Sequence, residues 1–375
     1  MGKITSFFSV KTQFENVGDA LINRELIRLA SAHGQAVVDV SRCPTEFQRT
    51  LALDGLPGVR VVHSTRRLFR DLIGARLAGH VAYYFLSPGG YFGDIHGLRK
   101  VSAWLNTLVL CALYIIGVRI CQVGVSYERL GPGYLRLLRA RARIMHRHLV
   151  RDEDSFKLLS RVGVRVDGTM PDLSVSAARG STAAGPCPGH ALALSFRVDQ
   201  DEGQSEAIKR VVVMLDEELS ADLPFKVVVQ VKRDLSFARE LVNDLAKAGN
   251  RPVSLIDCSD DIDRCIREYA DCHIVLSNRL HALLIGAIAG VVPVAVTLPN
   301  VNGKIAALFR DCNLGQNVFD LGQPNGVDAV VAALKEGRAF AKIDLESLRE
   351  QLLSCIRDLF DRGCRAVISQ VAVPR

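Results

Sequence analysis

The segment Ser277 to His281, with the sequence SNRLH, contains residue types that can bind an anion and transfer a proton. It lies between the strand-like run HIVLS and the very apolar helical pattern ALLIGAIAG. Asn278 can cap this helix, whose free N–H groups and dipole favour a bound anion. Arg279 and His281 would then lie in the first turn and supply a positive charge and a proton donor. The alternative is a capped helix with a histidine in the core.

Two more basic residues are placed to join such a site. Arg197 ends the run Ser195-Phe196-Arg197 at the carboxyl end of an apolar strand pattern, and its rigid guanidinium pairs well with carboxylate or phosphate. Lys304 follows the sequence PNVNG and could add a second positive charge. We predict that Ser195, Arg197 and Lys304 bind substrate, although a surface ion pair and an exposed helix-start lysine are the simpler alternatives.

The first part of the chain offers acidic groups and glycines. In the run Asn16-Val17-Gly18-Asp19, Gly18 can take unusual backbone angles, and Asp19 either caps the following helix or faces a substrate hydroxyl. We include Asn16 and Gly18 among the predicted substrate-binding residues and Asp19 among the catalytic ones.

A glycine-rich run, SPGGYFGD, follows a strongly apolar strand pattern. Gly89 and Gly90 would let the backbone approach a ligand, and Asp94 at the end of the run is a second candidate for the base. The run fits neither the dinucleotide fingerprint nor a Walker sequence. A plain tight loop is the alternative.

The composition indicates a globular protein. The 375 residues are 49% hydrophobic and 23% charged, which suits two domains with real cores. The formal net charge is +7, and the basic run from Arg136 to Arg147 contains no interleaved aromatic residue. We interpret this run as a solvated helix face and predict no nucleic-acid partner; a phosphate-bearing substrate or an anionic membrane surface would explain the mild positive charge equally well.

The ten cysteines include no C-x-x-C pair. Cys258, Cys265 and Cys272 recur every seven residues, which suits one side of a helix better than a zinc site. We predict reduced thiols in the core and no metal.

The N-terminus shows no secretion signal, and we expect a cytoplasmic protein. The apolar stretch from Leu105 to Val125 is broken by polar residues and Gly117, so we predict a buried helix over 103–116 and a buried strand over 118–124.

Strand and helix patterns alternate along the whole chain, which predicts an α/β fold with parallel sheets. We expect a first domain over 1–178, a Gly/Pro-rich linker over 177–189, a second domain over 190–340 and a C-terminal segment over 341–375 with a helix near 344–361. The predicted strands are 3–10, 36–40, 59–63, 80–86, 118–125, 147–151, 191–196, 226–231, 253–257, 273–277 and 292–296; the predicted helices are 19–32, 204–220, 235–248, 260–269 and 279–289. Ligands of such folds bind beyond the carboxyl ends of the strands, here in a cleft between the domains.

The order of these short motifs resembles the polysaccharide pyruvyl transferase family. Asn-x-Gly-Asp, the glycine-rich run, QVGVSYERLGP, RDEDS, PDL, SFR and SNRLHALL with a later P…K follow one another from about residue 14 to 310. The triple glycine that is usual in the family reads Gly89-Gly90-Tyr91 here.

The resemblance implies two Rossmann-like domains with a central cleft, similar to the GT-B glycosyltransferase architecture. It implies a transferase that moves pyruvate from phosphoenolpyruvate to a saccharide as a ketal, in the biosynthesis of a cell-surface polymer or exopolysaccharide. Arg197, Arg279 and Lys304 would hold the donor. His281 would be the acid, and Asp19 or Asp94 would assist the attacking hydroxyl. This chemistry requires no cofactor.

Two other functions stay open at this point. One is a GT-B glycosyltransferase that uses a nucleotide sugar, and the other is a catalytically silent partner in a polysaccharide assembly complex. A lipid-linked acceptor, with peripheral contact at the inner face of the membrane, and a homo-oligomer are also compatible with the sequence.

Overall fold

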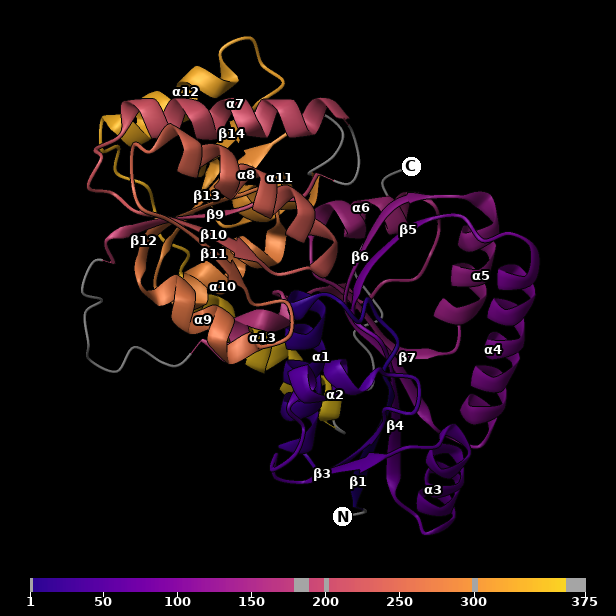
Figure 1. Cartoon of the computed structure of the whole chain (residues 1–375). Helices are drawn as coiled ribbons and strands as arrows, with labels where there is room; N and C mark the ends of the chain where they lie inside the picture. The colour runs from indigo at the N-terminus through magenta and orange to yellow at the C-terminus, as the bar shows by residue number, and fades with distance from the viewer. Residues whose placement is uncertain (1–2, 179–188, 199–201, 299–302, 362–375) are drawn as a thin grey trace.

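The computed structural model describes residues 3–178, 189–198, 202–298 and 303–361, and it contains two parallel β-sheets (Figure 1). The first sheet has the strand order β3-β2-β1-β4-β6-β7-β8, with β5 paired to β6. Its strands are β1 Ile4–Ser9, β2 Gln35–Asp39, β3 Val59–Val62, β4 Val81–Leu86, β5 Gly89–Gly93, β6 Arg119–Leu130, β7 Met145–Val150 and β8 Gly168–Thr169. Its helices are α1 Val17–Ser31, α2 Thr45–Leu51, α3 Thr65–Leu77, α4 Gly97–Ile115, α5 Pro132–Ala142, α6 Glu153–Arg161 and the 3-10 helix η1 Leu173–Ala177.

The second sheet has the order β11-β10-β9-β12-β13-β14. Its strands are β9 Ala191–Ser195, β10 Phe225–Val229, β11 Val253–Asp257, β12 Cys272–Ser277, β13 Val292–Thr297 and β14 Val318–Asp320. Its helices are α7 Glu202–Glu218, η2 Lys232–Asp234, α8 Leu235–Ala248, α9 Ile262–Ala270, α10 Leu280–Ile288, α11 Gly303–Asp311, η3 Gly315–Asn317 and α12 Gly326–Lys335; α13 Leu345–Phe360 follows. In both sheets the strand order reverses beside the first strand, the point where α/β folds bind ligands.

Both sheets follow from apolar runs that are short enough for strands and bounded by turns. Parallel strands are covered on both faces, so they are apolar throughout, and all five residues of β9 are buried. We refer to the part that contains the first sheet as the first half and to the part that contains the second sheet as the second half.

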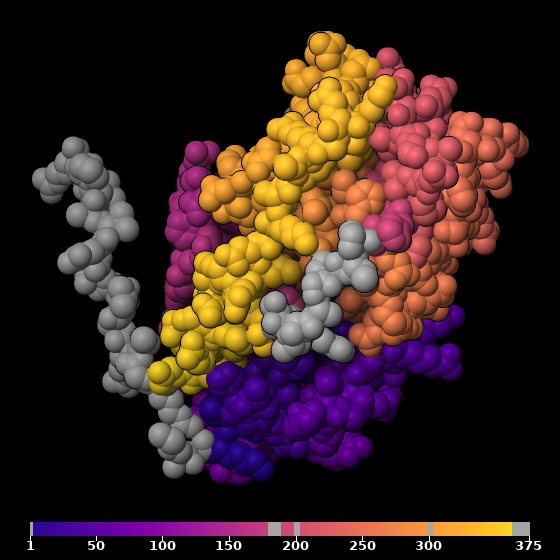
Figure 2. Space-filling model, turned by 90° about the vertical axis from the view of Figure 1, so that its left-hand side faces the viewer, coloured from indigo at the N-terminus to yellow at the C-terminus, as the bar shows by residue number. Residues whose placement is uncertain are grey.

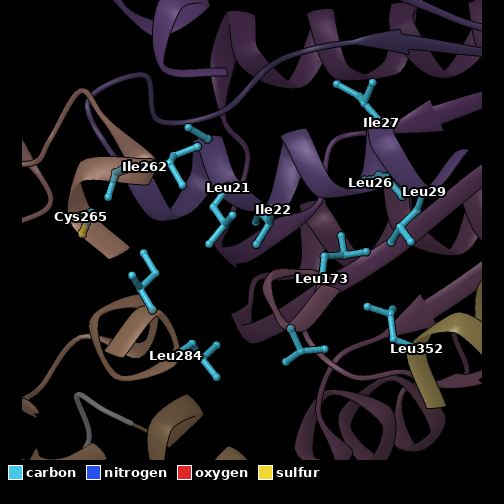
Figure 3. Packing of buried hydrophobic residues seen from close by; sticks show 14 of the residues in the cluster. Leu21, Ile22, Leu26, Ile27, Leu29, Leu173, Ile262, Cys265, Leu284 and Leu352 are labelled. Atoms are coloured by element: carbon cyan, nitrogen blue, oxygen red, sulfur yellow. The ribbon is translucent and has the colours of Figure 1, made fainter. Parts of the chain in front are cut away.

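One hydrophobic core runs across the two halves (Figure 3). Leu21 and Leu26 of α1 belong to the same cluster as Ile262 of α9 and Leu284 of α10. Backbone bonds add to this contact, because Val17 N donates to the carbonyl of Gln230 over 3.1 Å. The halves therefore meet through packed side chains as well as through the chain connection.

Helix α13 follows the second half in sequence but packs onto the first half. Figure 2 shows this yellow segment descending from the second half onto the indigo first half. Leu352, Ile356 and Phe360 are buried, and the Phe360 ring lies 4.5 Å from that of His33 and 4.8 Å from that of Tyr83. The C-terminal helix is thus part of the first half's core.

Several local predictions were wrong. The glycine-rich run is not a loop, because residues Gly89–Gly93 form strand β5 alongside β6. The three evenly spaced cysteines do not share a helix: Cys258 follows β11, Cys265 lies in α9 and Cys272 begins β12. All three thiols are free and buried, as are those of Cys43 and Cys121. The predicted linker falls largely outside the described residues.

The predicted buried helix over 103–116 is also wrong in its environment. Helix α4 extends over Gly97–Ile115, and among its residues Thr107, Leu110 and Leu113 are the buried ones. Within the described chain it is the one helix long and apolar enough to cross a membrane by length and composition alone.

Candidate active site

A cavity of about 980 Å³ lies between the two halves, at the carboxyl ends of strands from both sheets. The first half contributes residues that follow β1, β4 and β7 and residues of β5 and β6 themselves, and the second half contributes residues that follow β9, β10, β12 and β13. Predicted site residues among its lining are Asn16, Asp19, Gly89, Gly90, Arg197, Asn278, Arg279, His281 and Lys304. Nine of the twelve predicted residues therefore meet in one place.

His281 lies in the first turn of α10 and lines the cavity. Its Nε2 atom is buried and has no hydrogen-bond partner among the described residues. Burial lowers the pKa of His281, while the carboxylates of Asp172 and Asp19 act in the opposite direction. A buried imidazole nitrogen without a partner, facing a cavity, is available to exchange a proton with a ligand.

Gly18 contacts His281 directly across the interface between the halves. A Cβ atom at residue 18 would lie 2.3 Å from the Nδ1 atom of His281. The backbone of Gly18 does not have a positive φ, so our expectation of unusual backbone angles was wrong. A glycine is required here because the imidazole ring fills the space that any side chain would need.

The start of α1 is capped differently from the prediction. Asn16 is the N-cap, and its side chain accepts from Gly18 N over 3.0 Å. The carboxylate of Asp19 accepts instead from Thr12 Oγ1 over 2.6 Å and from Gln13 N over 3.2 Å. Because the cap is supplied by Asn16, Asp19 can line the cavity with a fixed orientation.

Asn278 does not cap α10, contrary to the prediction. Its Oδ1 atom accepts from Arg197 N over 2.7 Å, and its Nδ2 atom donates to Arg197 O over 2.8 Å. Ser277 Oγ accepts from Arg279 N over 2.9 Å and donates to the carbonyl of Ser195. These bonds tie the end of β12 to the end of β9, which places Arg197 and Arg279 side by side at the reversal of strand order.

The buried Arg279 guanidinium forms an ion pair with Asp234, which follows β10 and is also buried. The pair fixes the position of the guanidinium at the cavity wall. An arginine held in this way is preorganised for a second anion, since its five N–H donors exceed what one carboxylate can accept.

Lys304 approaches the cavity from α11 and links the glycine-rich strand to the second half. Its Nζ atom lies 3.4 Å from Glu128 Oε2 and would lie 2.6 Å from a Cβ atom at Gly90. Burial lowers the pKa of Lys304, and the charge of Glu128 opposes this shift. Gly89 has a φ of 115°, which favours glycine, and Gly90 leaves room for the ammonium group.

Ser195 and Asp94 lie apart from the lining. Ser195 is buried at the end of β9. The Asp94 carboxylate accepts from Tyr134 N over 2.7 Å and from Gly133 N over 3.2 Å. These two amides belong to the first turn of α5, so Asp94 caps that helix. The geometry argues against our assignment of Asp94 as a base and of Ser195 as a substrate ligand.

A buried ion pair that the sequence analysis did not single out also belongs to the site. Arg151 lines the cavity, and its Nη1 atom donates to Asp172 Oδ2 over 2.8 Å, with both side chains almost fully buried. Arg151 follows β7 as Arg197 follows β9, so its place at the end of a strand was the available signal. Asp172 lies in the loop before η1. Both residues also belong to motifs on which the family resemblance rests, Arg151 to RDEDS and Asp172 to PDL, so these motifs were a further signal.

The described residues contain no group of three or more His, Cys, Asp or Glu side chains arranged to hold a metal ion. The site as described combines basic side chains, the imidazole of His281 and the carboxylates of Asp19, Glu128, Asp152, Asp154 and Asp320.

The model of the polysaccharide pyruvyl transferase family matches residues 16–299, which is most of the chain. The chain belongs to this family. It is therefore a transferase, and the family relates it to the modification of polysaccharides. A comparison with curated proteins found no match.

Solved structures with the same architecture have low sequence identity to this member of the pyruvyl transferase family. A glycosyltransferase from Rickettsia africae has a TM-score of 0.54 at 12% identity, and the alignment covers 96% of this chain and 93% of that one. Anabaena HepE in complex with UDP and glucose has a TM-score of 0.51 at 11% identity, with 94% and 99% covered. Phytolacca americana UGT2 has a TM-score of 0.51 at 10% identity, with 96% and 94% covered. These similarities establish the GT-B fold.

Proposed function

We propose that this protein transfers the pyruvyl group of phosphoenolpyruvate to a saccharide as a cyclic ketal, in the synthesis of a cell-surface polysaccharide or exopolysaccharide. The observation that carries the proposal is the group of basic side chains that line one cavity together with His281. Arg151, Arg197, Arg279 and Lys304 all line it. Phosphoenolpyruvate carries a carboxylate and a phosphate on one small skeleton, so it needs cations from several directions.

In the proposed reaction His281 protonates the methylene carbon of the donor. Positive charge then develops at the enol carbon, and a saccharide hydroxyl attacks that carbon. The C–O bond to phosphate breaks, and a second hydroxyl closes the ketal. The two saccharide hydroxyls each lose a proton. One of these protons returns to His281, which gave its own proton to the new methyl group, and the other leaves with inorganic phosphate.

Asp19 is the residue best placed to assist the attacking hydroxyl. It lies on the first-half side of the cavity, across from the arginines of the second half. Its fixed hydrogen bonds to Thr12 and Gln13 leave the carboxylate oriented as a general base. In this arrangement the second half, together with Arg151 of the first half, binds the donor, and the first half binds the acceptor.

A nucleotide-sugar glycosyltransferase is the competing function, because Anabaena HepE with the same fold was crystallised with UDP and glucose. The arginines of the cavity would hold a diphosphate as well as a phosphate and carboxylate. The two functions differ in the donor, which makes donor binding the deciding measurement.

The test is a calorimetric titration of the purified protein with phosphoenolpyruvate and, in parallel, with UDP-glucose. We expect phosphoenolpyruvate alone to bind, and we expect Lys304→Gln to weaken its binding about tenfold or more because a charge-assisted contact is lost. Lys335→Gln, at an exposed ion pair with Glu218, is the matched control and should bind like the wild type. Binding of UDP-glucose without phosphoenolpyruvate would assign the protein to the glycosyltransferases. A screen of saccharides for phosphate release from phosphoenolpyruvate then identifies the acceptor.

A further inference from the structure

Helix α4 presents a continuous apolar face to solvent on the side of the first half that lies away from the second half (Figure 1). Leu98, Val101, Leu105, Leu108 and Ile115 follow one another at intervals of three, four or seven residues, which places them on one stripe of the helix. Leu98 is 88% exposed, Leu108 63% and Ile115 81%. A stripe of this size is unusual on the surface of a monomeric protein and indicates an interaction site.

The opposite side of α4 is fixed to the protein. Leu110 and Leu113 are buried in the core of the first half, and Arg141 of α5 donates to Ala103 O and to Thr107 Oγ1, each over 2.9 Å. The helix cannot cross a bilayer while these contacts hold, although its length and composition would allow it. It can lie in the plane of an interface with its free stripe turned outward.

The surroundings of the stripe are strongly basic. Helix α3 contains four Arg and one Asp, α4 one Arg and one Lys, and α5 three Arg. The three helices thus carry a net charge of +8, whereas the whole chain carries +7. The single acidic residue, Asp71, is already paired with Arg60 over 2.7 Å.

A cavity of about 450 Å³ at the beginning of α4 is also lined by basic residues, and it lies between the basic surface and the candidate active site. Lys11, Arg99 and Arg141 line it, and none of its lining residues is acidic. Burial lowers the pKa of Lys11, and Arg42 and Arg141 lower it further, so the cavity favours an anion. Lys11 also lines the candidate active site, which connects the basic surface with the place of reaction.

We propose that α3, α4 and α5 form a membrane-docking surface, on which α4 lies in the interface of an anionic bilayer and the basic residues contact lipid phosphates. Charge complementarity favours an anionic bilayer over a second copy of the chain on this surface. Two copies of the chain meeting through this face would bring two strongly positive surfaces together, whereas an anionic bilayer attracts them. This inference goes beyond the proposed function and does not depend on the identity of the donor.

The chain contains a built-in reporter for this surface. Trp104 is its only tryptophan, lies in α4 and is 37% exposed. We expect its fluorescence to shift to shorter wavelength with phosphatidylcholine vesicles that contain phosphatidylglycerol. Pure phosphatidylcholine vesicles should give a much smaller shift. The protein should float with the anionic vesicles, and rising salt should weaken that binding because part of the attraction is electrostatic.

Variants separate the apolar and the electrostatic contribution. Leu105→Gln with Leu108→Gln should reduce binding to anionic vesicles about tenfold or more. Arg99→Gln with Lys100→Gln should also reduce it about tenfold, since each basic side chain near an anionic surface contributes several-fold. Val213→Gln is the matched control, because Val213 is an exposed apolar residue of α7 in the second half. It should bind like the wild type.

Failure of the wild type to bind anionic vesicles would overturn the proposal, and so would equal binding of the wild type and the Leu105→Gln, Leu108→Gln variant. Sedimentation velocity provides a second check. A dimer that dissociates in this variant, without vesicle binding by either protein, would assign the face to a second copy of the chain. Unchanged thermal midpoints would show that the exposed substitutions leave the fold intact.

Discussion

At the scale of single residues, His281 is the group whose protonation should depend most on the donor. Burial lowers its pKa in the free protein, and Asp172 limits that shift. A bound phosphoenolpyruvate would bring negative charges next to the imidazole and raise the pKa again. Between the free and the bound pKa, donor binding must therefore take up a proton, and affinity must fall as pH rises through the bound pKa.

Calorimetry in buffers with different ionisation enthalpies measures this uptake directly. We expect proton uptake on phosphoenolpyruvate binding by the wild type near neutral pH, and we expect His281→Gln to reduce it to the uptake of the donor's own phosphate. Equal proton uptake by the two proteins would show that His281 is not the group that titrates. The same variant should lose about 10²–10⁴-fold in the rate of phosphate release with an acceptor.

Gly18 offers a sharper test of geometry. In Gly18→Ala the new methyl group would displace the His281 ring, because the two would lie 2.3 Å apart. We expect about a hundredfold loss in the rate of phosphate release, the size that a misplacement of about 1 Å can cause. Gly74→Ala is the control: a Cβ atom at this residue of α3 would have nothing within 4 Å, and the variant should gain about 0.5–1 kcal/mol of stability without loss of rate. A fully active Gly18→Ala protein would contradict the arrangement described for the site.

At the scale of elements, Asp94 joins the glycine-rich strand β5 to helix α5. Its carboxylate accepts from the amide of Ile95 and from those of Gly133 and Tyr134 at the start of α5, and these bonds, with that of Ile95 first, lower the pKa of Asp94. The residue looked catalytic in the sequence because it follows glycines at the end of a strand. Its hydrogen bonds show that it connects β5 to α5.

Asp94→Ala distinguishes the two roles. We expect a loss of about 1 kcal/mol in the free energy of unfolding, typical of a helix cap, with phosphate release within a few-fold of the wild type. The comparison is Asp19→Asn, which should lose rate with little change in stability. A rate loss of more than about a hundredfold in Asp94→Ala at unchanged stability would restore Asp94 as the base.

The elements show where sequence patterns are informative. Apolar runs predicted most strands to within one or two residues, and helix 235–248 has the predicted bounds, because burial on both faces leaves a clear signal. Strand β6 continues to Leu130, beyond its predicted end at residue 125, and β5, β8 and β14 were not predicted as strands. The same signal did not predict the exposure of α4, because an apolar helix has the same sequence pattern whether it packs into a core or faces solvent. It also failed at Asn278: its local pattern fits a cap, but its partner Arg197 is 81 residues away.

At the scale of the whole molecule, the two halves and α13 share packing that should make them unfold together. The cluster that contains Leu26 of α1 also contains Leu284 of α10 and Leu352 of α13. Contacts of this kind couple units that would otherwise melt separately. The sequence patterns indicated two α/β units and a final helix, but they could not show which unit the helix joins.

Phe360→Ala tests this coupling. The Phe360 ring is buried against His33 and Tyr83, so its removal should cost about 3–5 kcal/mol. Calorimetric melting should show a single transition in the wild type and a lower one in the variant. The control Gln351→Ala, at an exposed position on the same helix, should stay within about 0.5 kcal/mol. Two separate transitions in the wild type would show that the halves are independent.

The return of α13 to the first half also limits how this protein can be recombined with its relatives. A chimera that exchanges acceptor-binding segments by cutting once, between the two sheets, would leave α13 with the wrong parent. Its buried face, with Leu352, Ile356 and Phe360, would then meet a foreign surface around Tyr83 and His33. A viable graft has to carry two segments, 1–178 and 344–361, so the unit of exchange is discontinuous in the gene although it is contiguous in space.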